Sequence, residues 1–96
     1  VIPCGAREDK HQMTPGAIRL AMTERAVASL GNPAISVRDT EIQNGPMMST
    51  WRLWKQYCEA NPTALVKFVT GSDNLKFFHT FDDPVQFINE TEFIVF

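Results

Sequence analysis

Two stretches of the chain repeat their apolar residues at the spacing of an α-helix. The first covers residues 14–30 and predicts one apolar stripe that faces a core, made of Ile18, Met22, Ala26 and Leu30. Thr14 is expected to cap this helix, with Pro15 at its first position. The second stretch predicts a helix that begins at residue 48, 49 or 50 and ends near residue 61. Four larger side chains of the two helices are predicted to be core: Met22, Met48, Trp51 and Trp54.

Shorter apolar runs predict strands between and after these helices. Residues 65–69 are apolar except for Lys67, which is typical of a strand covered on both faces, in a parallel sheet flanked by helices. Three further strands are predicted at residues 1–3, 34–37 and 93–96. A short helix is expected to end near residue 78. Another is expected to begin at Asp83 and Pro84, with Gln86 completing a capping box.

The predicted elements alternate in the order strand, helix, strand, helix, strand, helices, strand. This order, with connections long enough for right-handed crossovers, is typical of an α/β domain with a parallel sheet. The chain has 96 residues, 44% of them hydrophobic, so residues 1–96 are expected to form a single domain with one modest core. Apolar strands stand at both ends, which predicts that the chain is an incomplete portion of that domain.

Composition and charge narrow the classes of partner. The net charge is −2, from nine basic and eleven acidic side chains scattered along the chain, and gives no electrostatic reason to expect a nucleic-acid or membrane-surface partner. No apolar run approaches the roughly 18 to 20 residues of a membrane helix, so we expect a cytosolic protein. Cys4 and Cys58 predict two free thiols in a reducing compartment, with one disulfide as the alternative.

The strand at residues 64–70 leads into a polar loop in which ligand chemistry is expected, because ligands of parallel α/β sheets bind at the carboxyl ends of strands. Gly71 would let the backbone turn or approach a ligand, Ser72 would cap the next helix, and Asp73 would lie in its first turn. The sequence has no Ser-His-Asp arrangement, phosphate-loop lysine, glycine-rich dinucleotide motif or metal-spaced His or Cys pair. We therefore expect no catalytic and no metal-ligating residue in this chain.

Several pieces of the chain follow one another in a characteristic order and spacing. They are Ile2 and Pro3 before a loop with Lys10, Arg19 and Met22 on the next helix, Glu41 after the next strand, Ser49 and Thr50 at a helix start, and Gly71-Ser-Asp-Asn-Leu75 followed by Phe81. In these pieces the chain resembles the nicotinate or nicotinamide mononucleotide adenylyltransferases, of the wider nucleotidylyltransferase superfamily. The resemblance covers essentially all of this chain but only the middle portion of the family's domain. The family's glycine-rich first strand with its His-x-x-His-type motif, and its later Ser-Thr-x-x-Arg motif, are missing here.

The resemblance implies a Rossmann-like parallel sheet with flanking helices, of which this chain is part. It implies a complete enzyme, a nucleotidyltransferase of NAD biosynthesis, that joins nicotinate or nicotinamide mononucleotide to the AMP moiety of ATP and releases pyrophosphate, with Mg2+ on the ATP phosphates. Because the missing motifs hold the ATP phosphates, this chain alone would bind part of the mononucleotide and catalyse nothing. The family's missing first strand lies between two strand pairs, so residues 1–96 alone are not expected to fold cooperatively. A homo-oligomer is compatible with the resemblance, and the expected compartment is the cytoplasm, with the nucleus as the alternative.

The resemblance assigns binding of the mononucleotide mainly to the second half of the chain. Asp73 would accept hydrogen bonds from the ribose hydroxyls, beside a backbone that Gly71 lets approach the ligand. The alternatives are an aspartate that stabilises a helix dipole and an ordinary turn glycine. Ser49 and Thr50 would present backbone amides at a helix start to the carboxylate or amide group of the pyridine. The other reading is a plain N-cap, and the two are compatible.

Three further positions complete the implied site. Phe81 stands where the family commonly has a tryptophan that stacks on the pyridine ring, with a core aromatic as the alternative, and the backbone amide of Asp82 would reach the same group. Lys10 matches a basic position in the loop that closes over the triphosphate, and a solvated lysine is the alternative. Arg19 and Glu41 are expected to form a supporting ion pair.

Two other functions are kept beside this one. The first is a related nucleotidylyltransferase with another phosphate acceptor, such as phosphopantetheine or a sugar or alcohol phosphate. The aromatic Phe81 and the helix start at Ser49 and Thr50 favour a pyridine over these acceptors. The second is an α/β binding module without catalysis, for which the fold alone would be the evidence.

Overall fold

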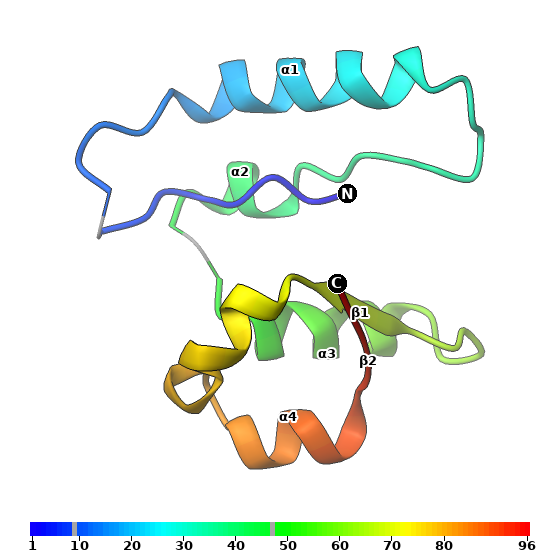
Figure 1. Cartoon of the computed structure of the whole chain (residues 1–96). Helices are drawn as coiled ribbons and strands as arrows, with labels where there is room; N and C mark the ends of the chain where they lie inside the picture. The colour runs from blue at the N-terminus through cyan, green and yellow to red at the C-terminus, as the bar shows by residue number, and fades with distance from the viewer. Residues whose placement is uncertain (9, 47) are drawn as a thin grey trace. The chain divides into compact units, whose positions relative to one another are not determined.

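The computed structural model describes residues 1–8, 10–46 and 48–96. In it the chain divides into two compact units, Val1–Met48 and Ser49–Phe96, which are described in turn (Figure 1). The first unit contains the helices α1 (Gly16–Ser29) and α2 (Thr40–Asn44). The second contains α3 (Thr50–Ala60), β1 (Lys67–Thr70), the 3-10 helix η1 (Ser72–Thr80), α4 (Pro84–Glu90) and β2 (Glu92–Val95). The chain is thus a mixture of helix and strand, and the single domain stays a prediction.

The first predicted helix is confirmed as α1. Pro15 occupies its N-cap position, so the predicted cap by Thr14 is wrong. The Thr14 carbonyl instead accepts a hydrogen bond from Arg19 Nε at 2.8 Å. At the other end Gly31 has a φ of 60°, a left-handed conformation that favours glycine and ends the helix where the sequence predicts.

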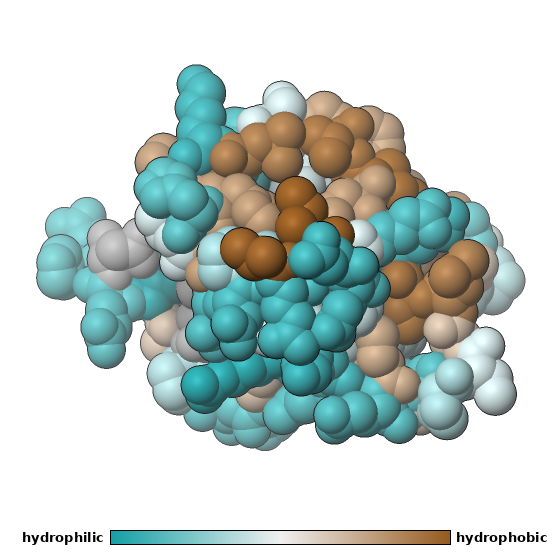
Figure 2. All heavy atoms as spheres, turned by 90° about the horizontal axis from the view of Figure 1, so that it is seen from below, coloured by the Kyte–Doolittle hydropathy of each residue, from teal (hydrophilic) through white to brown (hydrophobic). Residues whose placement is uncertain are grey.

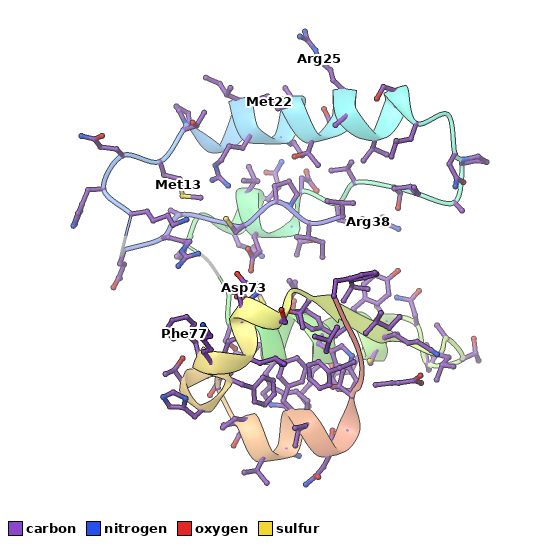
Figure 3. All side chains as sticks on the ribbon, viewed as in Figure 1. Met13, Met22, Arg25, Arg38, Asp73 and Phe77 are labelled. Atoms are coloured by element: carbon purple, nitrogen blue, oxygen red, sulfur yellow. The ribbon has the colours of Figure 1, made fainter. Side chains whose placement is uncertain are left out.

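The apolar stripe of α1 is exposed, which corrects the prediction that it faces a core. Ile18, Met22 and Leu30 are 51%, 62% and 63% exposed, and Figure 3 labels Met22 on this helix. Its packing partner α2 has five residues against the 14 of α1. Ile42 of α2 lies over Gly16, at the first turn of α1. A partner of this length cannot cover the whole stripe.

Residues 1–3 and 34–37 are both predicted as strands, and that prediction is wrong: Ala34 lies in a turn and the other residues have no regular secondary structure. One backbone hydrogen bond links the two regions: the N–H of Arg38, just after the second segment, donates to the Val1 carbonyl at 2.9 Å. The ladder does not continue, since Pro3 has no N–H to donate. After residue 37 the structure has α2, a short helix that the sequence pattern did not indicate.

The helices of the second unit begin where the sequence predicts. Ser49 is the N-cap of α3, and its hydroxyl accepts a hydrogen bond from the Arg52 N–H at 3.3 Å. Asp83 occupies the N-cap position of α4 with a φ of 47°. The predicted capping box with Gln86 is wrong, because an N-cap side chain reaches the first turn from the extended region of φ and ψ.

β1 and β2 form a parallel pair, with Lys67 opposite Glu92 and Thr70 opposite Val95. The pairing continues past the strand ends, where the Ser72 N–H donates to the Phe96 carbonyl at 2.7 Å. The parallel direction predicted for this strand is therefore confirmed. The sheet in the described part of the chain has two strands, and the complete Rossmann-like sheet stays a prediction.

One face of this sheet is packed and the other is exposed. On the packed face the rings of Phe68 and Phe93 lie 5.6 and 5.0 Å from that of Phe87. On the other face Lys67 forms an exposed ion pair across the two strands at 2.7 Å, and Val69 is 58% exposed. The prediction of a strand covered on both faces is wrong, because side chains alternate along a strand and, among the described residues of the second unit, the aromatic side chains of the helices pack on the phenylalanine side.

An aromatic cluster around Phe87 forms the core of the second unit. Phe87 is 0% exposed and Trp51 is 3% exposed. Six rings have centroids between 5.0 and 6.4 Å from that of Phe87: Trp51, Trp54, Phe68, Phe78, Phe81 and Phe93. Both tryptophans thus belong to the core as predicted. Met48 is half-buried, and the core prediction is wrong for Met22.

Large apolar side chains also reach the surface, as the brown areas of Figure 2 show. Leu65, Val85 and Phe96 are 78%, 71% and 81% exposed. Among the described residues, none of the helices has the length and apolar character needed to cross a membrane.

Candidate functional site

Asp73 and Gly71 are brought together at the carboxyl end of β1. Gly71 follows the last residue of the strand, and Asp73 lies in the first turn of η1, where Figure 3 labels it. A side chain at Gly71 would collide with Oδ1 of Asp73, so the carboxylate folds back over the glycine. Gly71 has a φ of −79°, which other residues adopt freely. The glycine leaves room for the carboxylate beside it, and the backbone conformation does not require it.

The loop that carries Asp73 is fixed by its neighbours. The Asn74 N–H donates to the Gly71 carbonyl at 3.1 Å, and Asn74 Nδ2 donates to Thr70 Oγ1 at 3.2 Å. Gly71 itself takes the N-cap position of η1, so the predicted cap by Ser72 is wrong. The Ser72 N–H donates a hydrogen bond to the carbonyl of Phe96, the residue after β2. This bond joins the loop to the end of the sheet. Asp73 is therefore an exposed carboxylate on an anchored turn.

Ser49 and Asp82 meet at the start of α3. The Ser49 hydroxyl donates to Asp82 Oδ2 at 3.1 Å while it accepts from the Arg52 N–H. Arg52 Nε also lies 3.2 Å from Asp82 Oδ2, with the two side chains 74% and 43% exposed. Thr50 is the first residue of the helix and is half-buried. Ser49 is therefore an N-cap, as one of its two readings expects, and the binding reading stays a prediction. The Asp82 carboxylate lies at the positive end of the helix dipole.

Phe81 belongs to the aromatic cluster. Its ring centroid lies 5.1 Å from that of Phe78 and 6.4 Å from that of Phe87, and the residue is half-buried. The core-aromatic alternative is therefore supported, with part of the ring left at the surface. The backbone N–H of Phe81 donates to the Phe78 carbonyl at 3.0 Å, which fixes the chain just before Asp82.

Lys10 lies in the loop before α1, in the first unit. Its side chain is exposed, and its backbone N–H donates to the Arg7 carbonyl at 3.3 Å. The other six predicted site residues belong to the second unit. The exposure of Lys10 suits both the phosphate-binding reading and the solvated-lysine reading.

The predicted ion pair between Arg19 and Glu41 is wrong, because each side chain bonds to backbone groups instead. Nη1 of Arg19 donates to the Cys4 carbonyl and lies 3.5 Å from the Cys4 thiol. Oε2 of Glu41 accepts from the Gly5 N–H at 2.8 Å, and its Oε1 accepts from the Met48 N–H at 3.1 Å. Glu41 is 4% exposed. Both cysteines are free thiols, as predicted.

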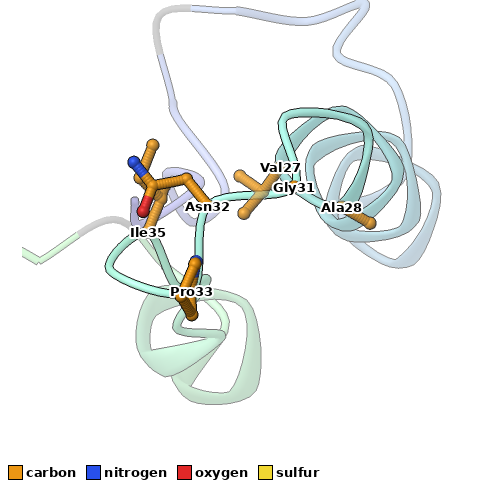
Figure 4. Close-up of a pocket in the computed structure, with 6 residues that line it drawn as sticks. All are labelled: Val27, Ala28, Gly31, Asn32, Pro33 and Ile35. Atoms are coloured by element: carbon orange, nitrogen blue, oxygen red, sulfur yellow. The ribbon is translucent and has the colours of Figure 1, made fainter.

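A hollow of about 330 Å³ opens at the end of α1 (Figure 4). It is lined by Val27, Ala28, Gly31, Asn32, Pro33 and Ile35, and it contains no predicted site residue. Within residues 1–8, 10–46 and 48–96, no three His, Cys, Asp or Glu side chains are grouped so that they could hold a metal ion. The candidate site is therefore made of the two surface groups described above: Asp73 with Gly71, and Ser49 with Asp82.

No protein-family model and no curated protein matches the chain. The resemblance to the mononucleotide adenylyltransferases thus stays a prediction from the residues themselves.

Proposed function

We propose that this chain is the mononucleotide-binding part of an adenylyltransferase. The complete protein would join nicotinate or nicotinamide mononucleotide to the AMP moiety of ATP and release pyrophosphate. One observation carries the proposal: the exposed carboxylate of Asp73 stands on an anchored turn at the carboxyl end of β1, a strand paired in parallel with β2. Ligands of parallel α/β sheets bind at this end of the strands.

Asp73 is suited to a ribose because a carboxylate accepts two hydrogen bonds and a ribose offers two neighbouring hydroxyls. The exposed position leaves the oxygens within reach of a ligand. Gly71 contributes by leaving room for the carboxylate, which would otherwise be pushed off the turn. A hydrogen bond to a charged acceptor stabilises a complex by roughly 1.5–3 kcal/mol. The hydrogen bonds from the ribose hydroxyls to Asp73 would therefore contribute to the affinity for the mononucleotide.

The start of α3 is suited to the ring substituent of the pyridine. Its first amides and the Ser49 hydroxyl form a positive helix end that attracts a carboxylate or an amide oxygen. Asp82 already lies there, bonded to Ser49 and Arg52. A bound nicotinate carboxylate would therefore compete with Asp82 for these donors, whereas a nicotinamide could donate its N–H to the Asp82 carboxylate.

In the complete protein the reaction would depend on alignment and charge neutralisation. The mononucleotide phosphate would attack the α-phosphorus of ATP and pyrophosphate would leave, and Mg2+ bound with ATP would supply charge neutralisation. The residues of this chain orient the acceptor. Lys10 would add a positive charge near the triphosphate.

An assay of the full-length protein tests the proposal. The protein is incubated with ATP, Mg2+ and each mononucleotide, and the dinucleotide and pyrophosphate are measured. We expect dinucleotide from at least one mononucleotide. Formation from neither would contradict the proposal, and product with phosphopantetheine in place of the mononucleotide would favour the related transferase.

A further inference from the structure

The hydrogen-bond donors at the start of α3 converge on one oxygen of Asp82. Its Oδ2 accepts from the Ser49 hydroxyl at 3.1 Å and lies 3.2 Å from Nε of Arg52. The Arg52 N–H donates in turn to the Ser49 hydroxyl oxygen. All three residues belong to the second unit. Two side-chain donors and one of the first amides of α3 are therefore already bonded within this unit.

The second oxygen of Asp82 is left as an acceptor. Among the described residues, both contacts of the Asp82 side chain are made by Oδ2. The side chain is 43% exposed, so a ligand can reach it. The preceding residue, Phe81, is half-buried in the aromatic cluster. A partly exposed ring and a carboxylate acceptor are thus neighbours in the chain, beside the start of α3.

We infer that this chain selects nicotinamide mononucleotide over nicotinate mononucleotide, and that the Asp82 carboxylate determines this specificity. The inference rests on the proposed function, in which the ring substituent of the pyridine lies at the start of α3. A carboxamide has a donor and an acceptor, so its NH2 group donates to Asp82 Oδ1 while its oxygen accepts from an amide of α3. A nicotinate carboxylate has acceptors only. It lies beside Asp82 as a second negative charge or displaces Asp82 from Ser49 and Arg52.

The positive charges nearby do not reverse this preference. The start of a helix carries the equivalent of about half a unit charge, against the full negative charge of Asp82. Arg52 is 74% exposed, and its Nε is already paired with Asp82. Solvent and salt weaken the attraction of so exposed a guanidinium for a second carboxylate.

The test measures the affinities of both mononucleotides by calorimetric titration of full-length wild type, Asp82→Asn and Asp83→Asn. The readout is the ratio of the two affinities, which does not change when a variant merely lowers the folded fraction. Asparagine at position 82 keeps an acceptor and adds an NH2 donor, so it suits either ring substituent. Asp83→Asn is the matched control. It removes the same charge from the next residue, which is exposed and makes no cap hydrogen bond.

We expect wild type to bind nicotinamide mononucleotide about tenfold more tightly than nicotinate mononucleotide, which still binds through the ribose and ring that the two ligands share. Asp82→Asn should lower this ratio to about twofold or less, mainly through tighter binding of the nicotinate form. Asp83→Asn should keep the wild-type ratio. Arg52→Gln, which removes the positive partner of Asp82, should raise the ratio, and it carries the test if Asp82→Asn fails to fold.

A wild type that binds the nicotinate form as tightly as the nicotinamide form, or more tightly, would overturn the inference and leave the proposed function standing. So would a ratio that Asp82→Asn leaves unchanged or that Asp83→Asn lowers equally. Wild-type protein that binds neither mononucleotide would overturn both.

Discussion

At the scale of single residues, Gly71 and Asp73 act together. The space that a side chain would need at Gly71 is taken by the Asp73 carboxylate, which is the flexible end of a side chain. The backbone of Gly71, with a φ of −79°, would accept alanine. A substitution at Gly71 therefore moves the carboxylate and leaves the fold in place.

Gly71→Ala is predicted to change the free energy of unfolding by less than about 1 kcal/mol and to weaken mononucleotide binding at least about tenfold. Unfolding in urea and calorimetric titration measure the two effects. The same substitution in an Asp73→Ala background serves as the control, because an effect transmitted through the carboxylate disappears when the carboxylate is gone. Equal losses of affinity in both backgrounds would contradict this account.

Cys58 offers a second residue-scale prediction. Burial raises the pKa of its thiol, and the neighbouring Glu59 carboxylate raises the pKa further. The reactive thiolate is therefore scarcer than in an unfolded chain at the same pH. Alkylation of Cys58 by iodoacetamide at pH 8 should be slower in the folded protein than in urea. The rate is followed by mass spectrometry of the peptide that contains Cys58, and equal rates would contradict the prediction.

The sequence predicts some residues whose partners lie close along the chain, although the caps expected of Thr14 and Ser72 are wrong, and it does not predict partners that are distant. The cap by Ser49 and the helix stop at Gly31 follow from local chemistry, and both are confirmed. The partners of Glu41 are backbone amides, which every residue except proline carries, so no sequence pattern indicates them. The contact between Asp73 and Gly71 is local, but the conformation of the aspartate side chain decides it.

At the scale of elements, α3 is the helix whose start matters most to the proposed site. Ser49→Ala removes the N-cap acceptor of the Arg52 N–H together with the bond to Asp82. An N-cap of this kind stabilises a helix by about 1 kcal/mol, so exchange of the Arg52 amide should become about fivefold faster. Hydrogen exchange measured by NMR tests this. Ser29→Ala is the control. It also removes a serine hydroxyl with a local hydrogen bond, from Ser29 to the Ala26 carbonyl, but at the C-terminal end of α1.

The apolar pattern predicted element types better than it predicted burial. Periodicity located α1 and α3, and the run at residues 65–69 overlaps β1. The same periodicity was wrong about the α1 stripe, since a repeat of apolar residues fixes which side chains share a face and says nothing of what lies opposite. The short α2 was missed because five residues carry too little periodicity.

At the scale of the whole molecule, the buried apolar surface is small. The hydrophobic side chains that are buried among the described residues are Trp51 and Phe87, both in the second unit. In the first unit the buried Glu41 and Gly5 contribute hydrogen bonds and close backbone contact in place of an apolar core. Cooperative unfolding depends on a shared apolar core.

We therefore predict that a peptide of residues 1–96 unfolds over a broad temperature range. Differential scanning calorimetry and circular dichroism follow the transition, and the first unit should lose protection against hydrogen exchange before the second. A single sharp transition with equal calorimetric and van't Hoff enthalpies would contradict this prediction.

The central claim is that the Asp73 carboxylate at the end of β1 binds the ribose of a pyridine mononucleotide. Calorimetric titration of nicotinate mononucleotide into full-length wild type, Asp73→Asn and Asp39→Asn tests it most directly. Asparagine keeps the shape and removes the charge, so Asp73→Asn should bind about 10- to 100-fold more weakly, while Asp39→Asn, at the exposed N-cap of α2, should bind as wild type does. Equal affinity of Asp73→Asn and wild type would contradict the claim.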